Sequence, residues 1–109
     1  MLLTIDIGNT NITLGLYKDQ DLGPRWRLAT DHERMPDEYG WQFFGLLHHS
    51  GHTVEEIHGI CLASVVPPLT GKIVEACRRY LYQDPLVVDA GVKTGVRIRY
   101  EDPRAVGAD

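Results

Sequence analysis

The chain has 109 residues, 43% of them hydrophobic and 24% charged, which is typical of one globular domain with a core of its own. Its net charge of -4 and its lack of a Lys/Arg run argue against nucleic acid or an anionic membrane as the main partner. No apolar stretch approaches the length of a membrane span, and the N-terminus lacks the basic start and cleavage site of a signal peptide.

The first seventeen residues predict two strands joined by a turn. Residues 2–7 form a dense apolar run, which is typical of a strand buried on both faces. Residues 8–11 indicate a tight turn, because Gly and Asn tolerate the positive φ that such turns need. Residues 12–17 alternate between large apolar residues and others, so the chain is expected to return as a second strand.

One carboxylate, Asp6, lies at the end of the first predicted strand. Burying it there without a partner would be costly. A turn of small residues beside it offers backbone N–H groups in a concave nest, which suits a phosphate. A carboxylate that could hold a metal ion, next to such a nest, indicates a nucleotide site. The alternative is a β-hairpin whose Asp caps its own turn, since short motifs have a high false-positive rate.

The middle of the chain predicts a third strand and a helix. Residues 25–30 follow a turn at Gly23 and Pro24 and read as a strand. Pro36 suits a first helical turn, and Gly51 suits the C-terminal cap. The helix between them has an apolar stripe that should face the sheet, formed by Tyr39, Phe43, Leu46 and Leu47.

A single helical turn is expected next, because Thr53 and Glu56 have capping-box spacing. Residues 58–66 then predict a strand, 69–82 a helix, 86–88 a short strand and 96–100 a half-exposed strand.

This order, β-β-β-α-β-α-β, predicts an α/β fold with a mixed five-stranded sheet of strand order 3-2-1-4-5. If both helices pack as their stripes suggest, each face of the sheet has a covering helix. Asp6 then lies at the carboxyl end of the central strand, where open α/β sheets bind ligands.

Cysteine and histidine are the two other residue types that could form a site. Cys61 and Cys77 form no CxxC and lie in apolar segments, which indicates buried free thiols in a reducing cytosol. His48, His49 and His52 are grouped like a loose metal cluster. No Cys, Asp or Glu supports them at metal-site spacing, so a solvated helix end is favoured.

Three blocks, in this order, resemble the type III pantothenate kinase family. They are residues 6–11 (DIGNTN), 64–67 (SVVP), and 91–96 (GVKTGV) continuing to Pro103 and residues 106–109 (VGAD). The first block is shared with actin-like ATPases and sugar kinases, and the third is the most specific. The family has the ribonuclease H-like fold of actin, Hsp70 and the sugar kinases, with ATP between two lobes. The resemblance implies that residues 1–109 are the first lobe and that the second lobe is absent from this chain.

The resemblance implies a cytoplasmic enzyme that uses ATP to phosphorylate pantothenate to 4'-phosphopantothenate, the first step of coenzyme A biosynthesis. It also implies Mg²⁺, a monovalent cation (K⁺ or NH₄⁺) with its site in the second lobe, and a homodimer in the intact protein. The alternative is a non-catalytic regulatory or transcription accessory protein of the same fold.

The resemblance assigns roles to individual residues. The general base is Asp109, and Asp6 lies near the metal. The ATP phosphates are bound by Asp6, Ile7, Gly8, Asn9, Thr10, Asn11, Ile12 and Thr13. Pantothenate is bound by Tyr100, Gly107, Ala108 and Asp109. The family motif continues from Asp109 into an Arg, and this chain stops one residue short. Because phosphoryl transfer depends on positioning, the 109-residue chain is expected to be inactive by itself.

Overall fold

The computed structural model describes residues 1–89, and their strands and helices follow one another in the predicted order. In chain order they are β1 (Leu2–Ile7), β2 (Asn11–Lys18), β3 (Asp21–Ala29), α1 (Pro36–His49), the 3₁₀ turn η1 (Val54–Glu56), β4 (Gly59–Ser64), α2 (Pro67–Ala76), the π-helical turn η2 (Cys77–Leu81) and β5 (Leu86–Asp89). The strand predicted at 96–100 lies outside the described residues. Within residues 1–89, neither helix is long and apolar enough to cross a membrane.

The five strands form one mixed sheet in the order β3-β2-β1-β4-β5. β1 pairs antiparallel with β2, and β2 pairs antiparallel with β3. On its other side β1 pairs parallel with β4, which pairs parallel with β5. The predicted strand order is therefore confirmed, with the first strand in the centre.

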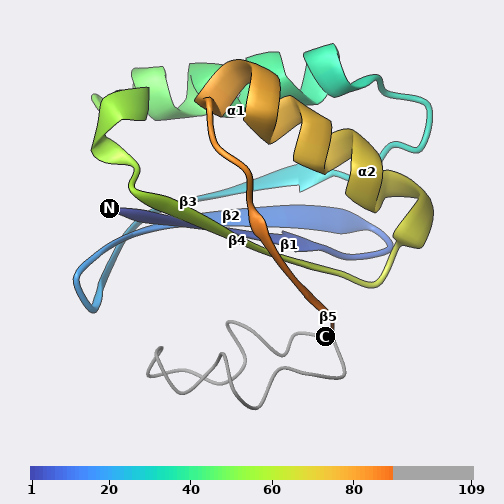
Figure 1. The fold of residues 1–109 in the computed structure, drawn as a ribbon, viewed down its shortest axis with the longest axis horizontal. Coiled ribbons are helices and arrows are strands. Elements are labelled where there is room, and N and C mark those ends of the chain that lie inside the picture. The colour runs from blue at the N-terminus through green and yellow to red at the C-terminus, as the bar shows by residue number, and fades with distance from the viewer. Residues whose placement is uncertain (90–109) are drawn as a thin grey trace.

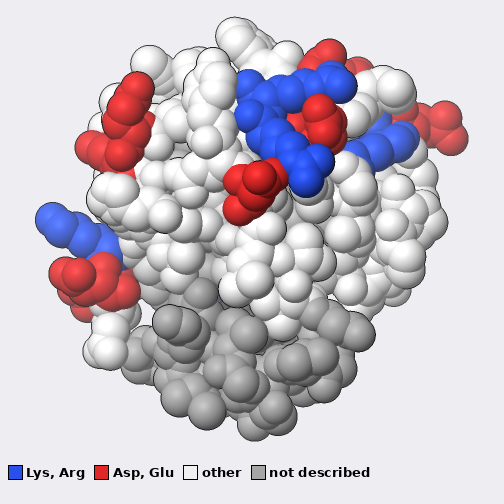
Figure 2. Space-filling view, viewed as in Figure 1, with Lys and Arg blue, Asp and Glu red and all other residues white. Residues whose placement is uncertain are grey.

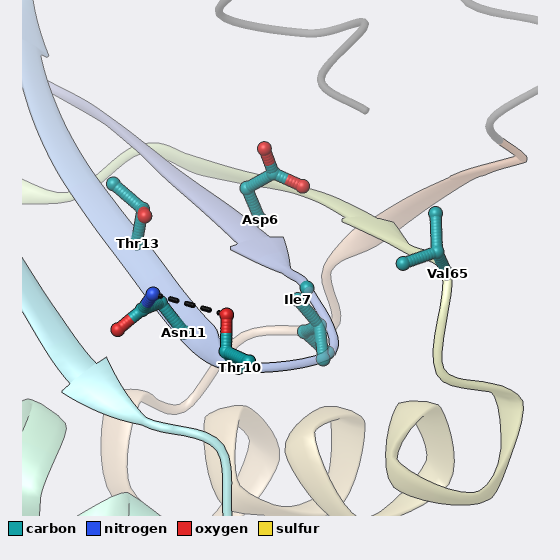
Figure 3. Close-up of a pocket in the computed structure, with 7 residues that line it drawn as sticks. Asp6, Ile7, Thr10, Asn11, Thr13 and Val65 are labelled. Atoms are coloured by element: carbon teal, nitrogen blue, oxygen red, sulfur yellow. Dashed lines mark hydrogen bonds between the residues drawn. The ribbon is translucent and has the colours of Figure 1, made fainter.

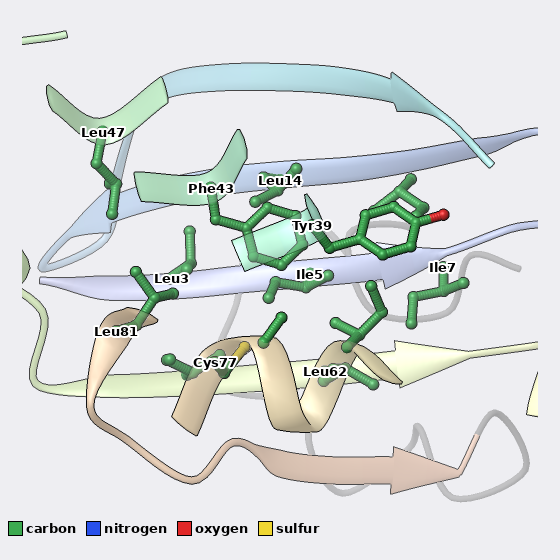
Figure 4. Packing of buried hydrophobic residues seen from close by; sticks show 14 of the residues in the cluster. Leu3, Ile5, Ile7, Leu14, Tyr39, Phe43, Leu47, Leu62, Cys77 and Leu81 are labelled. Carbon is green, nitrogen blue, oxygen red and sulfur yellow. The ribbon is translucent and has the colours of Figure 1, made fainter. Parts of the chain in front are cut away.

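Both helices lie on the same face of the sheet (Figure 1). Tyr39 and Phe43 of α1 are buried in one core with Ile73 of α2, against the sheet (Figure 4). The expectation of a helix on each face is wrong, because the apolar stripes of α1 and α2 merge into a single layer.

Burial alternates along β1. Leu3, Ile5 and Ile7 are at most 1% exposed, whereas the residues between them are half-buried. The prediction of a strand buried on both faces is therefore wrong. The described helices cover only one side of β1, so its apolar packing follows the two-residue period of a strand.

The opposite face of the sheet, away from α1 and α2, carries Asp6. Asp6 pairs with Thr13 of β2 and with Ala63 of β4, and Ala63 pairs with Val88 of β5. Residues that pair across neighbouring strands point to the same face. These four residues therefore form a row across the sheet near the carboxyl ends of its parallel strands.

The ends of α1 agree with the sequence prediction. Pro36 is its first residue, and acidic side chains follow in the first turn. Gly51 has φ +84° and donates its N–H to the His48 carbonyl at 3.0 Å, which is a glycine C-cap. The predicted single turn is η1, where the Thr53 N–H donates to Glu56 Oε1 at 3.3 Å.

Other boundaries differ from the prediction. β4 (Gly59–Ser64) is shorter at both ends than the strand predicted at 58–66, whereas β3 and the second helix are longer. β3 begins at Asp21 rather than at residue 25, so the turn predicted at Gly23 and Pro24 is wrong. β3 tolerates Pro24 because it is an edge strand of the sheet. α2 begins at Pro67, continues into η2, and reverses at Tyr82 with φ 59°. None of these differences changes the topology.

Charged side chains join α1 to η2. Arg79 Nη1 lies 3.0 Å from Asp37 Oδ1, and Arg79 Nε lies 2.8 Å from Glu75 Oε2. Arg78 pairs with Asp84. These ion pairs raise the pKa of both arginines above the usual value. Figure 2 shows the result as basic and acidic side chains side by side on this face. Exposed pairs of this kind contribute little to stability, so the core must hold the helices together.

A tight contact between α1 and η2 gives a stability prediction. A Cβ atom on Gly40 would lie 2.2 Å from Cδ1 and 2.6 Å from Cγ of Tyr80, so the whole ring would have to move. We expect Gly40→Ala to lower the free energy of unfolding by about 1–3 kcal/mol, as overpacking does. Gly45→Ala on the same helix is the control, because nothing lies within 4 Å of its Cβ. It should raise stability by roughly 0.5–1 kcal/mol. Urea denaturation measures both, and equal effects would contradict the prediction.

Candidate functional site

A pocket of about 240 Å³ lies at the carboxyl end of β1. Most of its wall comes from the β1–β2 hairpin, and one residue comes from the segment after β4 (Figure 3). Its lining residues are Asp6, Ile7, Gly8, Thr10, Asn11, Thr13 and Val65. The Val65 N–H donates to the Ile7 carbonyl at 3.0 Å and so joins the two segments. The pocket is thus at the sheet edge where ligands of open α/β sheets bind.

The turn between β1 and β2, residues Gly8 to Asn11, is closed by one backbone hydrogen bond. The Gly8 N–H donates to the Asn11 carbonyl at 2.9 Å. None of the four residues has positive φ, so the prediction of a left-handed turn is wrong. Glycine suits this position for another reason, because a Cβ at Gly8 would lie 3.1 Å from the Asn11 oxygen, a tighter contact than most Cβ atoms make. The predicted nest of N–H groups therefore cannot include that of Gly8, which is already bound.

Side-chain donors also face the pocket. Asn11 Nδ2 donates to Thr10 Oγ1 at 3.2 Å (Figure 3). A hydroxyl that accepts one hydrogen bond still has its own hydrogen to donate. Thr10 can therefore donate to a ligand oxygen while Asn11 holds its side chain in place.

The Asp6 carboxylate stands between two small or short neighbours, Thr13 and Ala63. Asp6 is half-buried. Figure 3 shows its carboxylate directed away from Thr10 and Asn11, on the same side as Thr13. Asp6 thus lies on the wall of the pocket, beside the turn.

Six of the eight residues expected at the phosphates line this pocket. The other two, Asn9 and Ile12, do not. Ile12 is fully buried in the core beneath the helices, so its side chain cannot reach a ligand in the pocket. Ile7 borders the pocket, but its side chain is also in that core. Four expected residues lie outside the described part of the chain: Tyr100, Gly107, Ala108 and Asp109.

Thr30 lies near the site, although the sequence did not indicate a role for it there. Its hydroxyl donates to the Gly8 carbonyl at 2.8 Å, and its N–H donates to the Thr10 carbonyl at 3.0 Å. The sequence predicted it only as the last residue of a strand. The signal that could have found it is strand register, because Ala29 pairs with Asn11 and places the next residue beside the turn.

Other reactive side chains lie away from the pocket. Cys77 is fully buried, as predicted, and burial raises the pKa of its thiol to about 12. Cys61 is only half-buried. His52 Nδ1 lies 2.9 Å from Glu56 Oε1, and this hydrogen bond lowers the pKa of Glu56. Among residues 1–89, no group of three or more His, Cys, Asp or Glu side chains could hold a metal ion.

The fold is similar to that of a solved sugar kinase. A crystal structure of a protein from Porphyromonas gingivalis, described as a candidate N-acetylglucosamine kinase, superposes with a TM-score of 0.59 at 16% sequence identity. The superposition covers 82% of this chain and 33% of that one. At this identity the similarity shows the fold alone, and it is the fold of the actin-like and sugar-kinase ATPases that the sequence predicted.

Sequence comparison is more specific. A profile of the family described as type III pantothenate kinase matches residues 2–109. Relatives named type III pantothenate kinase from Moorella thermoacetica and Halalkalibacterium halodurans are 50% and 42% identical over all 109 residues. The chain spans 43% of the length of each of these relatives. The chain therefore belongs to the type III pantothenate kinase family.

Proposed function

We propose that this chain is the first of two lobes of an ATP-dependent pantothenate kinase and supplies its phosphate turn, residues Gly8 to Asn11. The observation that carries the proposal is the position of Asp6, at the carboxyl end of the central strand and beside the pocket of the phosphate turn. The second lobe, with the adenine and K⁺ or NH₄⁺ sites, belongs to the part of the relatives that this chain does not span. The intact protein would be a cytoplasmic homodimer acting at the first step of coenzyme A biosynthesis.

The residues at the pocket fit Mg²⁺ bound together with ATP. Mg²⁺ in kinases is held by one or two carboxylates, by substrate phosphates and by several waters, not by a complete protein cage. Asp6 supplies one half-buried carboxylate, and the oxygens of Thr10 and Thr13 lie on the same pocket wall. When bound, the ion neutralises charge on the phosphates during transfer.

The protein groups then have separate tasks. Asp6 would hold the metal. Thr10 donates its hydroxyl hydrogen to a phosphate oxygen, and Gly8 keeps the turn tight enough for the phosphate to approach. The reaction breaks the bond between the β–γ bridging oxygen and the γ-phosphorus and forms one from the pantothenate hydroxyl oxygen to that phosphorus. Asp109 accepts the hydroxyl proton, while Tyr100, Gly107 and Ala108 hold pantothenate.

The test compares this chain with an extended protein, defined as the same 109 residues joined to the remaining residues of the Moorella relative. ADP release is measured with and without pantothenate, and the complete Moorella relative is the positive control. We expect pantothenate-dependent turnover by the extended protein and at least a tenfold lower rate for the chain alone, because half of the positioning groups are missing.

Two results would contradict this. Turnover by the chain alone within tenfold of the extended protein would mean that the site lies within residues 1–109. A folded extended protein that binds ATP without pantothenate-dependent ADP release would favour the non-catalytic regulatory or transcription accessory role.

A further inference from the structure

We propose that Thr30 is a positioning residue that sets the shape of the phosphate turn. This inference rests on the proposed function, since the task it assigns to the turn is to receive the phosphates of ATP. Thr30 follows β3 directly and lies next to the turn, although it is far from it in sequence.

Two hydrogen bonds connect Thr30 to alternate carbonyls of the turn. Its Oγ1 donates to the Gly8 oxygen at 2.8 Å, and its backbone N–H donates to the Thr10 oxygen at 3.0 Å. In a planar trans peptide, the C=O and the following N–H point in opposite directions. Holding these two carbonyls therefore fixes the directions of the Asn9 and Asn11 N–H groups. Thr30 therefore orients two peptide groups of the turn, Gly8–Asn9 and Thr10–Asn11.

Thr30 is in turn held by the hydrophobic core. The N–H of the next residue, Asp31, donates to the Tyr39 hydroxyl at 3.0 Å, and that hydroxyl donates to the Asp31 carbonyl at 2.6 Å. Tyr39 belongs to α1 and is fully buried. The backbone that carries Thr30 is thereby fixed to a side chain that cannot move without disturbing the core.

The same segment is also joined to α2. Lys72 Nζ donates to the His32 carbonyl at 2.9 Å and to the Arg34 carbonyl at 3.1 Å. The segment after β3 therefore contacts both helices at one end and the phosphate turn at the other. Contacts with the helical layer, and not only its own hairpin, thus fix the position of the turn.

The Thr30 hydroxyl makes a hydrogen bond that the pairing of β2 with β3 does not require. The backbone bond from Thr30 to Thr10 already continues the pairing of β2 with β3. The second bond, from Oγ1 to Gly8, goes to the turn itself. One closing hydrogen bond, from Gly8 to Asn11, is described within the turn. Losing the hydroxyl should therefore affect phosphate positioning more than it affects folding.

The test uses Thr30→Val, which keeps the side-chain shape and the backbone bond but removes the donor to Gly8. Thr30→Ser keeps the hydroxyl. The matched control is Thr4→Val, because Thr4 Oγ1 also donates to a carbonyl, that of Gly15 at 3.3 Å, away from the pocket. In the extended protein we expect Thr30→Val to lower kcat/KM for ATP by about tenfold, within the range that misplacement by an ångström can cause. The KM for pantothenate, the activity of Thr30→Ser and that of Thr4→Val should stay near wild type.

Equal ATP kinetics for Thr30→Val and Thr4→Val would overturn the inference, as would failure of Thr30→Ser to retain activity. Hydrogen exchange of the turn amides, measured without substrate, separates this inference from the proposed function. If the wild-type extended protein shows no pantothenate-dependent turnover, the proposed function has failed. Faster exchange at Asn9 and Asn11 in Thr30→Val than in Thr4→Val would still support the positioning role, and equal exchange would overturn it.

Discussion

Asp6→Asn is expected to lower kcat of the extended protein by about 10²-fold or more, the usual cost of removing a preorganised electrostatic contact at a reacting centre. The amide has nearly the shape of the carboxylate but no negative charge for Mg²⁺. Asp6 is half-buried on the wall of the pocket at the β1–β2 turn, so its charge is screened less than that of a surface residue. The Mg²⁺ concentration needed for half-maximal rate should rise as well.

Asp21→Asn is the matched control, since it removes a charge from an exposed residue at the start of β3 that does not line the pocket. Its kinetics should equal those of the wild type. Steady-state rates over a Mg²⁺ titration measure both variants. Unchanged kcat and KM in Asp6→Asn would remove the carboxylate from the proposed mechanism.

The second large effect is expected at Asp109. Asp109→Asn can still orient the pantothenate hydroxyl but cannot accept its proton, so kcat should fall by roughly 10²–10⁴-fold, the range of general-base catalysis. The KM for pantothenate should change far less. In a loose transition state the proton moves late, so a smaller loss would indicate that the residue mainly positions the alcohol.

The dependence of kcat on pH provides the second measurement for Asp109. Protonation of a general base stops catalysis, so the wild type should lose activity at low pH, and this loss should be absent from the residual activity of Asp109→Asn. An unchanged kcat with a raised KM for pantothenate would make Asp109 a binding residue. The base would then have to be sought elsewhere.

The sheet was predictable because its signals are local. Alternation in β2, the Pro36 start and Gly51 end of α1, and the parallel crossovers together gave the strand order. The prediction of a helix on each face was wrong, although the strand order already implies that both helices lie on one face. The connections β3–α1–β4 and β4–α2–β5 both move in the same direction along the sheet. Right-handed crossovers in one direction place their helices on one face.

The candidate site was predictable where residue type alone indicates chemistry. Asp6 and the small residues of the turn fall into this class, and the structure brings them to one pocket. Thr30 was not predictable from residue type, because its role depends on which residues of β2 and β3 pair. The positive φ expected in the turn was wrong, and Gly8 instead approaches the Asn11 carbonyl closely. The pantothenate segment up to Asp109 stays a prediction.

The central position of β1 has a consequence for the nascent chain. Its antiparallel partner follows at once, but its parallel partner begins only with Gly59, which pairs with Leu2. At a synthesis rate of about 5–20 residues per second, the ribosome adds the intervening residues over several seconds. During this time one edge of β1 has no neighbouring strand, and the row of Leu3, Ile5 and Ile7 lacks the cover of α2, which is made only after β4. An open apolar edge is a template for pairing with other chains. The emerging polypeptide is therefore most exposed to aggregation after β3 is made and before β4 leaves the ribosome.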